Sequence, residues 1–310
     1  MPAAAQSILV IKLAALGDFI QALGPLAAIR RHHSDAKITL LTTAPFRALA
    51  QASGYVDEVW CDGRPSILAV SEWLALRSRL RSGGFDRVYD LQTSDRSSHY
   101  FRLFWPGPAP EWSGIARGCS HPHTNPARDL MHTTERQREQ LAMAGIEDVP
   151  VADVSWAEAN VTRFDLAEKF ALIVPGGALH RPAKRWPVEN FAALAVRLSD
   201  RGLQPVLLGG EGEAGTFAPI MAACPEAVYL AGQTDLFDLA ELGRRAALAV
   251  GNDTGPMHMI AATGCKSLVL YSDASDPALC AQRGERVAIL HREYLEDLKV
   301  DEVERDLDNS

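Results

Sequence analysis

Short apolar runs alternate with longer segments of helical periodicity along most of the 310-residue chain. The alternation opens with an expected strand over residues 7–13 and an expected helix over 17–31. It breaks between residues 92 and 129, a proline-rich stretch expected to be mostly loop, and a second block starts at residue 170. Strands joined through helices have connections long enough for parallel crossovers. The pattern therefore predicts two Rossmann-like α/β domains with parallel sheets facing a cleft.

The remaining elements are expected from the same periodicities. Further strands are expected over 38–42, 56–61, 87–91, 170–174, 204–208, 247–250 and 267–271. Further helices are expected over 45–53, 66–82, 130–144, 188–200, 215–223, 235–245 and 256–263. The domain boundaries expected are 1–155, 165–290 and a charged tail helix at 291–310. Docking of this tail back onto the N-terminal domain is one option.

Composition excludes several classes of protein. Hydrophobic residues make up 47% of the chain and charged residues 23%, which suits a soluble globular protein rather than a disordered one. A net charge of −8 argues against a protein that coats nucleic acid. The five cysteines form no C-x-x-C pair and are expected to be reduced thiols. With no signal peptide and no apolar stretch of about 20 residues, we expect a cytoplasmic protein, with peripheral inner-membrane contact as an option.

Three stretches directly follow expected strands, where α/β proteins bind ligands. The first is the turn from Lys12 to Asp18, in which Gly17 permits a sharp bend and Asp18 lies at a helix N-terminus. Asp18 as a simple helix cap is the alternative. The glycine triad of a dinucleotide-binding turn is absent, since Gly24 lies well inside the helix.

The second stretch, residues 174–187, combines glycines with three cations that can neutralise phosphate: Arg181, Lys184 and Arg185. The alternative is an exposed basic loop with Trp186 packed beneath it. A weaker candidate is Glu211, a carboxylate after a glycine turn that can accept hydrogen bonds from ribose hydroxyls or simply be solvated.

The third stretch, residues 251–258, offers good N-cap residues and Pro256 at the start of a helix. A helix N-terminus binds diphosphate well. Asp253 beside such a site is unexpected unless its carboxylate contacts a hydroxyl or a cation. A capping loop without a ligand is the alternative.

Taken together, these motifs resemble those of the bacterial heptosyltransferases, glycosyltransferase family nine. The resemblance rests on three segments in register, with the helix from Met131 to Arg136 and the sequence Asp90-Leu91-Gln92 as further similarities. The three segments are Ile11-Lys12…Gly17-Asp18, Pro175-Gly176…Lys184-Arg185-Trp186-Pro187 and Asp253-Thr254-Gly255-Pro256-Met257-His258.

The resemblance implies a GT-B architecture and inverting, metal-independent transfer of a sugar, with Asp18 as general base and Lys184 on the donor phosphate. It also implies a donor-binding C-terminal domain and an acceptor-binding N-terminal domain. The residues expected to bind the donor are Gly177, Arg181, Glu211, Asp253, Thr254, Gly255 and His258. Those expected to bind the acceptor are Gly17, Gln92 and Arg96. Small hydroxyl residues of the family are replaced by Gly177, Ala178 and Leu179, so backbone N–H groups, His180 or Arg181 would take their place.

The implied partners are a nucleotide-sugar donor, with ADP-heptose as the family default, and a lipid-linked or lipopolysaccharide-core saccharide acceptor. No cofactor and no metal are expected, because Lys184 and helix N–H groups supply the positive charge. His121 and His123 are interpreted as polar surface residues of a loop rather than as a pair of metal ligands. Two alternatives remain: a non-catalytic sugar-nucleotide-binding protein of the same fold, and an NAD(P)-dependent oxidoreductase.

Overall fold

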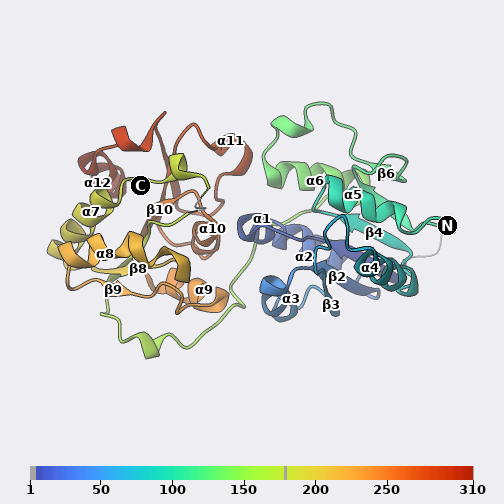
Figure 1. Ribbon diagram of the computed structural model, residues 1–310, viewed down its shortest axis with the longest axis horizontal. Helices are drawn as coiled ribbons and strands as arrows, with labels where there is room; N and C mark the ends of the chain where they lie inside the picture. Colours follow the sequence, from blue (N-terminus) through green and yellow to red (C-terminus); the bar gives the residue numbers. More distant parts are fainter. Residues whose placement is uncertain (1–4, 178–179, 310) are drawn as a thin grey trace. The chain divides into compact units, whose positions relative to one another are not determined.

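The computed structural model describes residues 5–177 and 180–309, except for the side chains of Glu211 and Ala214. The chain divides into two compact units, Met1–Ala152 and Asp153–Ser310 (Figure 1). Each unit contains its own six-stranded sheet, and every strand pairing in both sheets is parallel. The prediction of an α/β fold with parallel sheets is confirmed. No helix of the described chain is both long and apolar enough to cross a bilayer.

The N-terminal sheet has the strand order β3-β2-β1-β4-β5-β6. Its strands are β1 (Ser7–Ile11), β2 (Lys37–Thr42), β3 (Glu58–Cys61), β4 (Arg87–Asp90), β5 (Glu111–Gly114) and β6 (His121–Pro122). The helices of this unit are α1 (Leu16–Gln21), α2 (Leu23–His32), α3 (Arg47–Ala52), α4 (Val70–Ser82), α5 (Asp95–Arg102) and α6 (Thr133–Met143). Short 3₁₀ turns are η1 (Ala44–Phe46) and η2 (Arg128–Leu130).

The C-terminal sheet has the order β12-β11-β10-β7-β8-β9. Its strands are β7 (Phe170–Val174), β8 (Gln204–Leu207), β9 (Val228–Tyr229), β10 (Leu248–Asn252), β11 (Ser267–Tyr271) and β12 (Val287–His291). Its helices are α7 (Val188–Asp200), α8 (Ala214–Ala223), α9 (Leu236–Arg245), α10 (Gly255–Ala262), α11 (Pro277–Cys280) and α12 (Val300–Asn309). Short 3₁₀ turns are η3 (Thr162–Phe164), η4 (Pro182–Lys184), η5 (Glu211–Glu213) and η6 (Leu295–Asp297).

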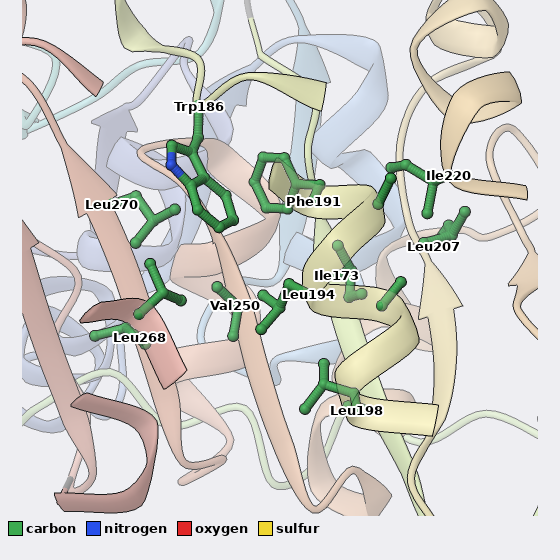
Figure 2. Packing of buried hydrophobic residues seen from close by; sticks show 14 of the residues in the cluster. Ile173, Trp186, Phe191, Leu194, Leu198, Leu207, Ile220, Val250, Leu268 and Leu270 are labelled. Carbon is green, nitrogen blue, oxygen red and sulfur yellow. The ribbon is translucent and has the colours of Figure 1, made fainter. Parts of the chain in front are cut away.

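The core of the C-terminal unit lies between the sheet and α7, α8 and α12 (Figure 2). Trp186 and Phe191 meet edge to face at 4.8 Å between ring centroids, and both are fully buried. The Trp186 indole N–H donates to the Leu298 carbonyl at 2.9 Å, which satisfies the polar end of this ring. The loop that carries Lys184 therefore ends on a rigid aromatic anchor.

The tail helix α12 packs on the C-terminal unit. Its buried Val303 and Leu307 belong to the same core cluster as α7. Arg197 of α7 also pairs with Asp301 and Glu304, at 2.5 and 2.7 Å. The apolar face of α12 is therefore covered by α7 of the same unit.

The structure differs from the sequence-based expectations at three places. The expected helix over 17–31 is divided at Ala22, because Pro25 cannot donate a hydrogen bond to the Gln21 carbonyl. The region 92–129, expected to be mostly loop, contains α5, β5 and β6. Its first proline is Pro106, after α5 has ended, and β6 is an edge strand that tolerates Pro122. The edge strands β9 and β12 were also missed.

In each parallel sheet, the order in which successive strands are added reverses at one point. In the N-terminal sheet this point lies between β1 and β4, and in the C-terminal sheet it lies between β7 and β10. The loops that leave two such strands diverge to opposite faces and open a crevice at the carboxyl edge. Each unit therefore has one preferred place for a ligand, which the motifs of the sequence occupy.

Candidate functional site

A cavity of about 430 Å³ lies at the carboxyl edge of the C-terminal sheet, next to the ends of β7, β8 and β10. Most of the expected donor-binding residues line it. Its lining consists of Val174, Gly176, Gly177, Arg181, Lys184, Gly209, Gly210, Glu213, Asp253, Thr254, Gly255 and Pro256. His258 does not line it and is buried within α10.

Asn252, the last residue of β10, organises the wall of this cavity. Its fully buried side-chain amide donates to the carbonyls of Pro175 at 2.8 Å and Gly176 at 3.1 Å. Its Oδ1 accepts from the Trp186 backbone N–H at 3.0 Å. One side chain thus holds both ends of the loop that carries Lys184. From the sequence, Asn252 is expected only as a helix cap; the signal for its wider role is an amide at the end of an otherwise apolar strand.

Lys184 and Asp253 form an ion pair at 2.5 Å, with side chains only 15% and 8% exposed. The same Oδ2 atom accepts from the Ser275 hydroxyl at 2.7 Å. Oδ1 accepts from the Tyr271 hydroxyl at 2.9 Å and the Gln282 amide at 3.1 Å. Burial opposes ionisation, but the hydrogen bonds from Lys184 and Ser275 outweigh it and lower the pKa of the Asp253 carboxyl. The condition set by the sequence, that Asp253 contacts a cation and hydroxyls, is met.

The N-terminus of α10 faces the cavity through Thr254 and Gly255. Thr254 is the N-cap residue, but its side chain makes no capping hydrogen bond. Its Oγ1 atom is buried and has no partner within the described part of the chain. A buried hydroxyl without a partner at a helix N-terminus is a suitable contact for an anionic ligand.

In the glycine turn that follows β8, Glu213 is the acid with a described side chain, and it lines this cavity. Its carboxylate accepts from the backbone N–H of Gly177 at 2.7 Å and of Gly210 at 2.9 Å. A Cβ atom on Gly176 would lie 2.2 Å from Glu213 Oε1, so a larger residue at this position would displace the carboxylate. Glu211, the acid expected here from the sequence, has a side chain that lies outside the described residues, and Glu213 was not expected. Two acids in one glycine turn could not be separated by spacing alone.

Arg181 lines the cavity while its guanidinium donates to the Ala274 carbonyl at 2.7 Å. Gly177 is also part of the lining, but Ala178 and Leu179 lie outside the described residues. His180 is exposed and does not line the cavity.

A second cavity, of about 120 Å³, lies at the carboxyl edge of the N-terminal sheet between the loops that follow β1 and β4. It brings Asp18 and Gln92 together with three cations, Lys12, Arg128 and Arg136. Its lining consists of Lys12, Asp18, Leu91, Gln92, Thr93, Arg128, Thr133, Arg136, Gln137 and Gln140.

Asp18 lies in the first turn of α1, where its Oδ2 accepts from the Ala15 backbone N–H at 3.2 Å. The carboxylate is therefore a cap and also a wall of the cavity, so the two interpretations of Asp18 do not exclude each other. Gly17 is buried beside it in the same turn.

Gln92 fixes the loop that carries Asp18. Its side-chain oxygen accepts from the backbone N–H groups of Leu13 at 2.8 Å and Ala14 at 3.1 Å. The buried Asp90 in turn accepts from the Gln92 and Thr93 N–H groups at 3.1 and 3.0 Å. The two loops at the sheet's switch point are thus held to each other.

Buried ionisable groups lie in the lining of this second cavity and next to it. Burial lowers the pKa of Lys12 and, against hydrogen bonds from the Thr93 backbone and the Ser97 side chain, raises the pKa of Asp90 to about 6. Burial, followed by the positive charge of Arg136, also lowers the pKa of Arg128. Three cations around Asp18 make this cavity suited to an anionic ligand.

Two residues, Arg96 and His123, do not lie where the sequence led us to expect them. Arg96 does not line either cavity: it donates to the Pro65 carbonyl at 3.1 Å and lies over the Trp73 ring at 5.6 Å. His123 is buried, and its Nε2 atom lies 3.5 Å from Glu139 Oε1. The interpretation of His123 as a polar surface residue was therefore wrong.

Comparison with known proteins shows the family and the fold of this chain. A family model described as glycosyltransferase family 9 (heptosyltransferase) matches residues 73–305. This chain belongs to that family. Lipooligosaccharide heptosyltransferase 2 of Haemophilus influenzae is 36% identical over 104 residues, 32% of this chain and 30% of that protein. Lipopolysaccharide heptosyltransferase 2 of Escherichia coli is 34% identical over 134 residues, 41% of this chain and 38% of that protein. The matched segments span about a third of these relatives.

The fold is shared over the whole chain of a solved family member. The structure of the Escherichia coli ADP-heptose lipopolysaccharide heptosyltransferase II matches with a TM-score of 0.80 at 24% identity, covering 98% of both chains. The predicted GT-B fold of this family 9 chain is thereby confirmed.

Proposed function

We propose that this family 9 protein transfers heptose from ADP-heptose to a saccharide of the lipopolysaccharide core, with inversion at the anomeric carbon. The observation that carries the proposal is the presence of two different cavities, one at the switch point of each sheet. One presents a lysine and a helix N-terminus, and the other presents a carboxylate among cations. The names of its relatives supply the donor sugar and the acceptor class.

The C-terminal cavity is proposed to bind the donor. Lys184 and the N–H groups at the start of α10 would hold the diphosphate, with the Thr254 hydroxyl as a further donor. Glu213 would accept hydrogen bonds from the ribose hydroxyls. Asp253 would hold Lys184 in place through the ion pair, since this carboxylate is itself fixed by Ser275 and two further donors.

The N-terminal cavity is proposed to bind the acceptor. Lys12, Arg128 and Arg136 would attract an acidic group of the saccharide, a phosphate or a carboxylate. Gln92 would act on the acceptor indirectly, through the loop that it fixes. An acceptor attached to lipid would bring the reaction to the cytoplasmic face of the inner membrane.

Transfer in one displacement requires two events at the anomeric carbon. The acceptor hydroxyl gives its proton to Asp18 as its oxygen forms the new glycosidic bond, a form of help generally worth about 10²–10⁴-fold. The bond from the sugar to ADP breaks at the same time, and its electron pair leaves with the diphosphate. Lys184 and the end of α10 stabilise that developing charge without moving far. Because these groups supply the positive charge, no step of the proposal uses a divalent metal.

The proposal is tested by incubating the protein with ADP-heptose and heptose-free core acceptor, with UDP-, GDP- and CMP-sugars as control donors. The expected result is ADP release coupled to a heptosylated product of inverted anomeric configuration, read by nuclear magnetic resonance. Retained configuration would exclude the single displacement. ADP binding without transfer to any core acceptor would indicate a binding protein instead.

A further inference from the structure

The N-terminal unit exposes apolar side chains on α4, on the loop before it and on the segment after α5. We call this region, formed by residues 63–82 and 96–109, the α4–α5 face (Figure 1). Five of its large apolar side chains are between 59% and 89% exposed. They are Ile67, Leu68, Val70, Leu74 and Trp105.

Helix α4 is apolar on two sides. Leu76 and Leu80 point into the core of the unit, where they pack with residues of α5 and the sheet. Val70 and Leu74, four residues apart, share a different side of the helix and are 66% and 59% exposed. A surface helix normally has one apolar side, so the second one indicates a partner.

The exposed residues belong to one continuous surface. Arg77, on the same side of α4 as Val70 and Leu74, donates to the carbonyls of Leu103 at 3.1 Å and Trp105 at 3.0 Å. The segment after α5 therefore runs along α4 and adds Trp105 to its exposed side. At the other end, Arg96 donates to Pro65 in the loop before α4.

The α4–α5 face is also basic. It contains six arginines, a histidine and a single glutamate, although the whole chain has a net charge of −8. Arg81 and Arg102 are exposed, and neither forms an ion pair with a described residue, whereas Arg79 lies over the Trp60 ring and interacts electrostatically with Glu58. The positive charge of this face is therefore available to an external anion.

We propose that the α4–α5 face docks on an anionic lipid bilayer. Apolar side chains including tryptophan, mixed with arginine, are typical of segments that lie in the bilayer interface. The guanidinium of an arginine can reach a lipid phosphate while its hydrocarbon stem lies among apolar groups. Each basic group near an anionic lipid surface strengthens the attraction of the protein to that surface. A purely apolar protein partner would leave these arginines without a counter-charge.

The position of the face suits a lipid-linked acceptor. Ile67 and Leu68 lie in the loop after β3, at the same carboxyl edge of the parallel sheet as the cavity that holds Asp18. Docking through this loop would hold that edge near the bilayer. This functional reason rests on the proposed acceptor, whereas the docking itself does not.

Flotation of the full-length protein with vesicles tests the proposal without any acceptor. Vesicles of phosphatidylglycerol and phosphatidylethanolamine should bind the protein, and vesicles of phosphatidylcholine alone should bind it much less. The triple variant Ile67→Ser, Leu68→Ser, Trp105→Ser should lower the partition coefficient by about tenfold or more. The double variant Arg81→Glu, Arg102→Glu should lower it by about tenfold or more on anionic vesicles.

Matched controls are available on the same protein. Val151→Ser removes another apolar side chain that is 77% exposed, and Arg305→Glu reverses an exposed charge on α12. Both should bind vesicles as the unaltered protein does. All altered side chains are exposed, so thermal unfolding should be unchanged in every variant.

The proposal would be overturned if the unaltered protein did not float with anionic vesicles. It would also be overturned if the two α4–α5 variants bound these vesicles as well as the unaltered protein does. A change from dimer to monomer in the triple variant, without vesicle binding, would assign the face to self-association instead. Transfer to a water-soluble core oligosaccharide separates this proposal from the proposed function. It should be unaffected in the α4–α5 variants, and its absence in the unaltered protein would contradict only the proposed function.

Discussion

At the scale of single residues, Asp18 has a structural and a proposed chemical role that one substitution separates. In Asp18→Asn the side-chain oxygen still accepts from Ala15, so α1 stays capped. Proton abstraction is lost, and we expect turnover to fall by about 10²–10⁴-fold with the Kd of ADP unchanged. Steady-state kinetics and calorimetry measure the two quantities. Asp95→Asn, an acid in the first turn of α5, is the control, and unaltered turnover in Asp18→Asn would remove the general base.

Lys184 is expected to act on the diphosphate and not merely on Asp253. Lys184→Ala should weaken ADP binding by about tenfold or more, since a charge-assisted contact to phosphate is lost. It should also slow transfer, because the leaving group loses the same charge. Calorimetric titration with ADP measures the first effect, with the exposed Lys169→Ala as the control. An unchanged Kd would mean that the ion pair serves the fold alone.

Asp90 connects stability to pH. Its folded pKa of about 6 lies above the ordinary value of 3.8, so folding favours the protonated form. That contribution is complete below about pH 4 and is lost as pH rises through 6. Asp90→Asn keeps an oxygen for Gln92 and Thr93 but cannot ionise. Its free energy of unfolding, relative to the unaltered protein, should rise by up to about 3 kcal/mol between pH 4 and 7. Parallel pH profiles in urea denaturation would contradict this.

At the scale of elements, α12 is an integral part of the C-terminal unit. Leu307 is 1% exposed in the core cluster, so Leu307→Ala should lower the free energy of unfolding by about 2–5 kcal/mol. Arg305→Ala, exposed on the same helix, should change it by less than about 0.5 kcal/mol. Chemical denaturation measures both. Equal stabilities of the two variants would show that α12 is not packed as described.

Strong local signals made most elements predictable from sequence. Buried central strands such as β1, β7 and β10 are continuous apolar runs, and their following loops contain the motifs. The elements that were missed carry weak signals: β6 has two residues, and β12 is an edge strand that is mostly only half-buried. Helix α5 begins with a Ser94–Ser97 capping box that the nearby prolines obscured.

The chemistry of the site was less predictable than its place. Switch-point topology puts the three motifs at the sheet edges, and this follows from strand order. The partners of each side chain depend on contacts distant in sequence, such as Tyr271 and Gln282 on Asp253, or Arg128 and Arg136 near Lys12. No local pattern encodes such pairs. Sequence therefore predicted Asp18, Lys184 and Asp253 as candidates, but not the hydrogen-bond network that holds them in place.

At the scale of the whole molecule, the two units divide the proposed substrates between them. The donor cavity is lined only by residues between 174 and 256, and the core beneath it is formed within the C-terminal unit. A fragment of residues 153–310 keeps Val154 and Ala157, whose carbonyls accept from Arg244. We expect this fragment to fold and to bind ADP with a Kd within about tenfold of the full-length value, because no lining residue is lost.

Bound ADP should stabilise the fragment and the full-length protein alike. At 100 times the Kd, the expected gain in the free energy of unfolding is about 2.7 kcal/mol, since only the folded state binds. Denaturation with and without ADP measures the gain, and Lys184→Ala in each background is the control. The fragment should show no transfer, because Asp18 is absent. A folded fragment that fails to bind ADP would mean that the donor site needs the N-terminal unit, and the division of substrates between the units would then be wrong.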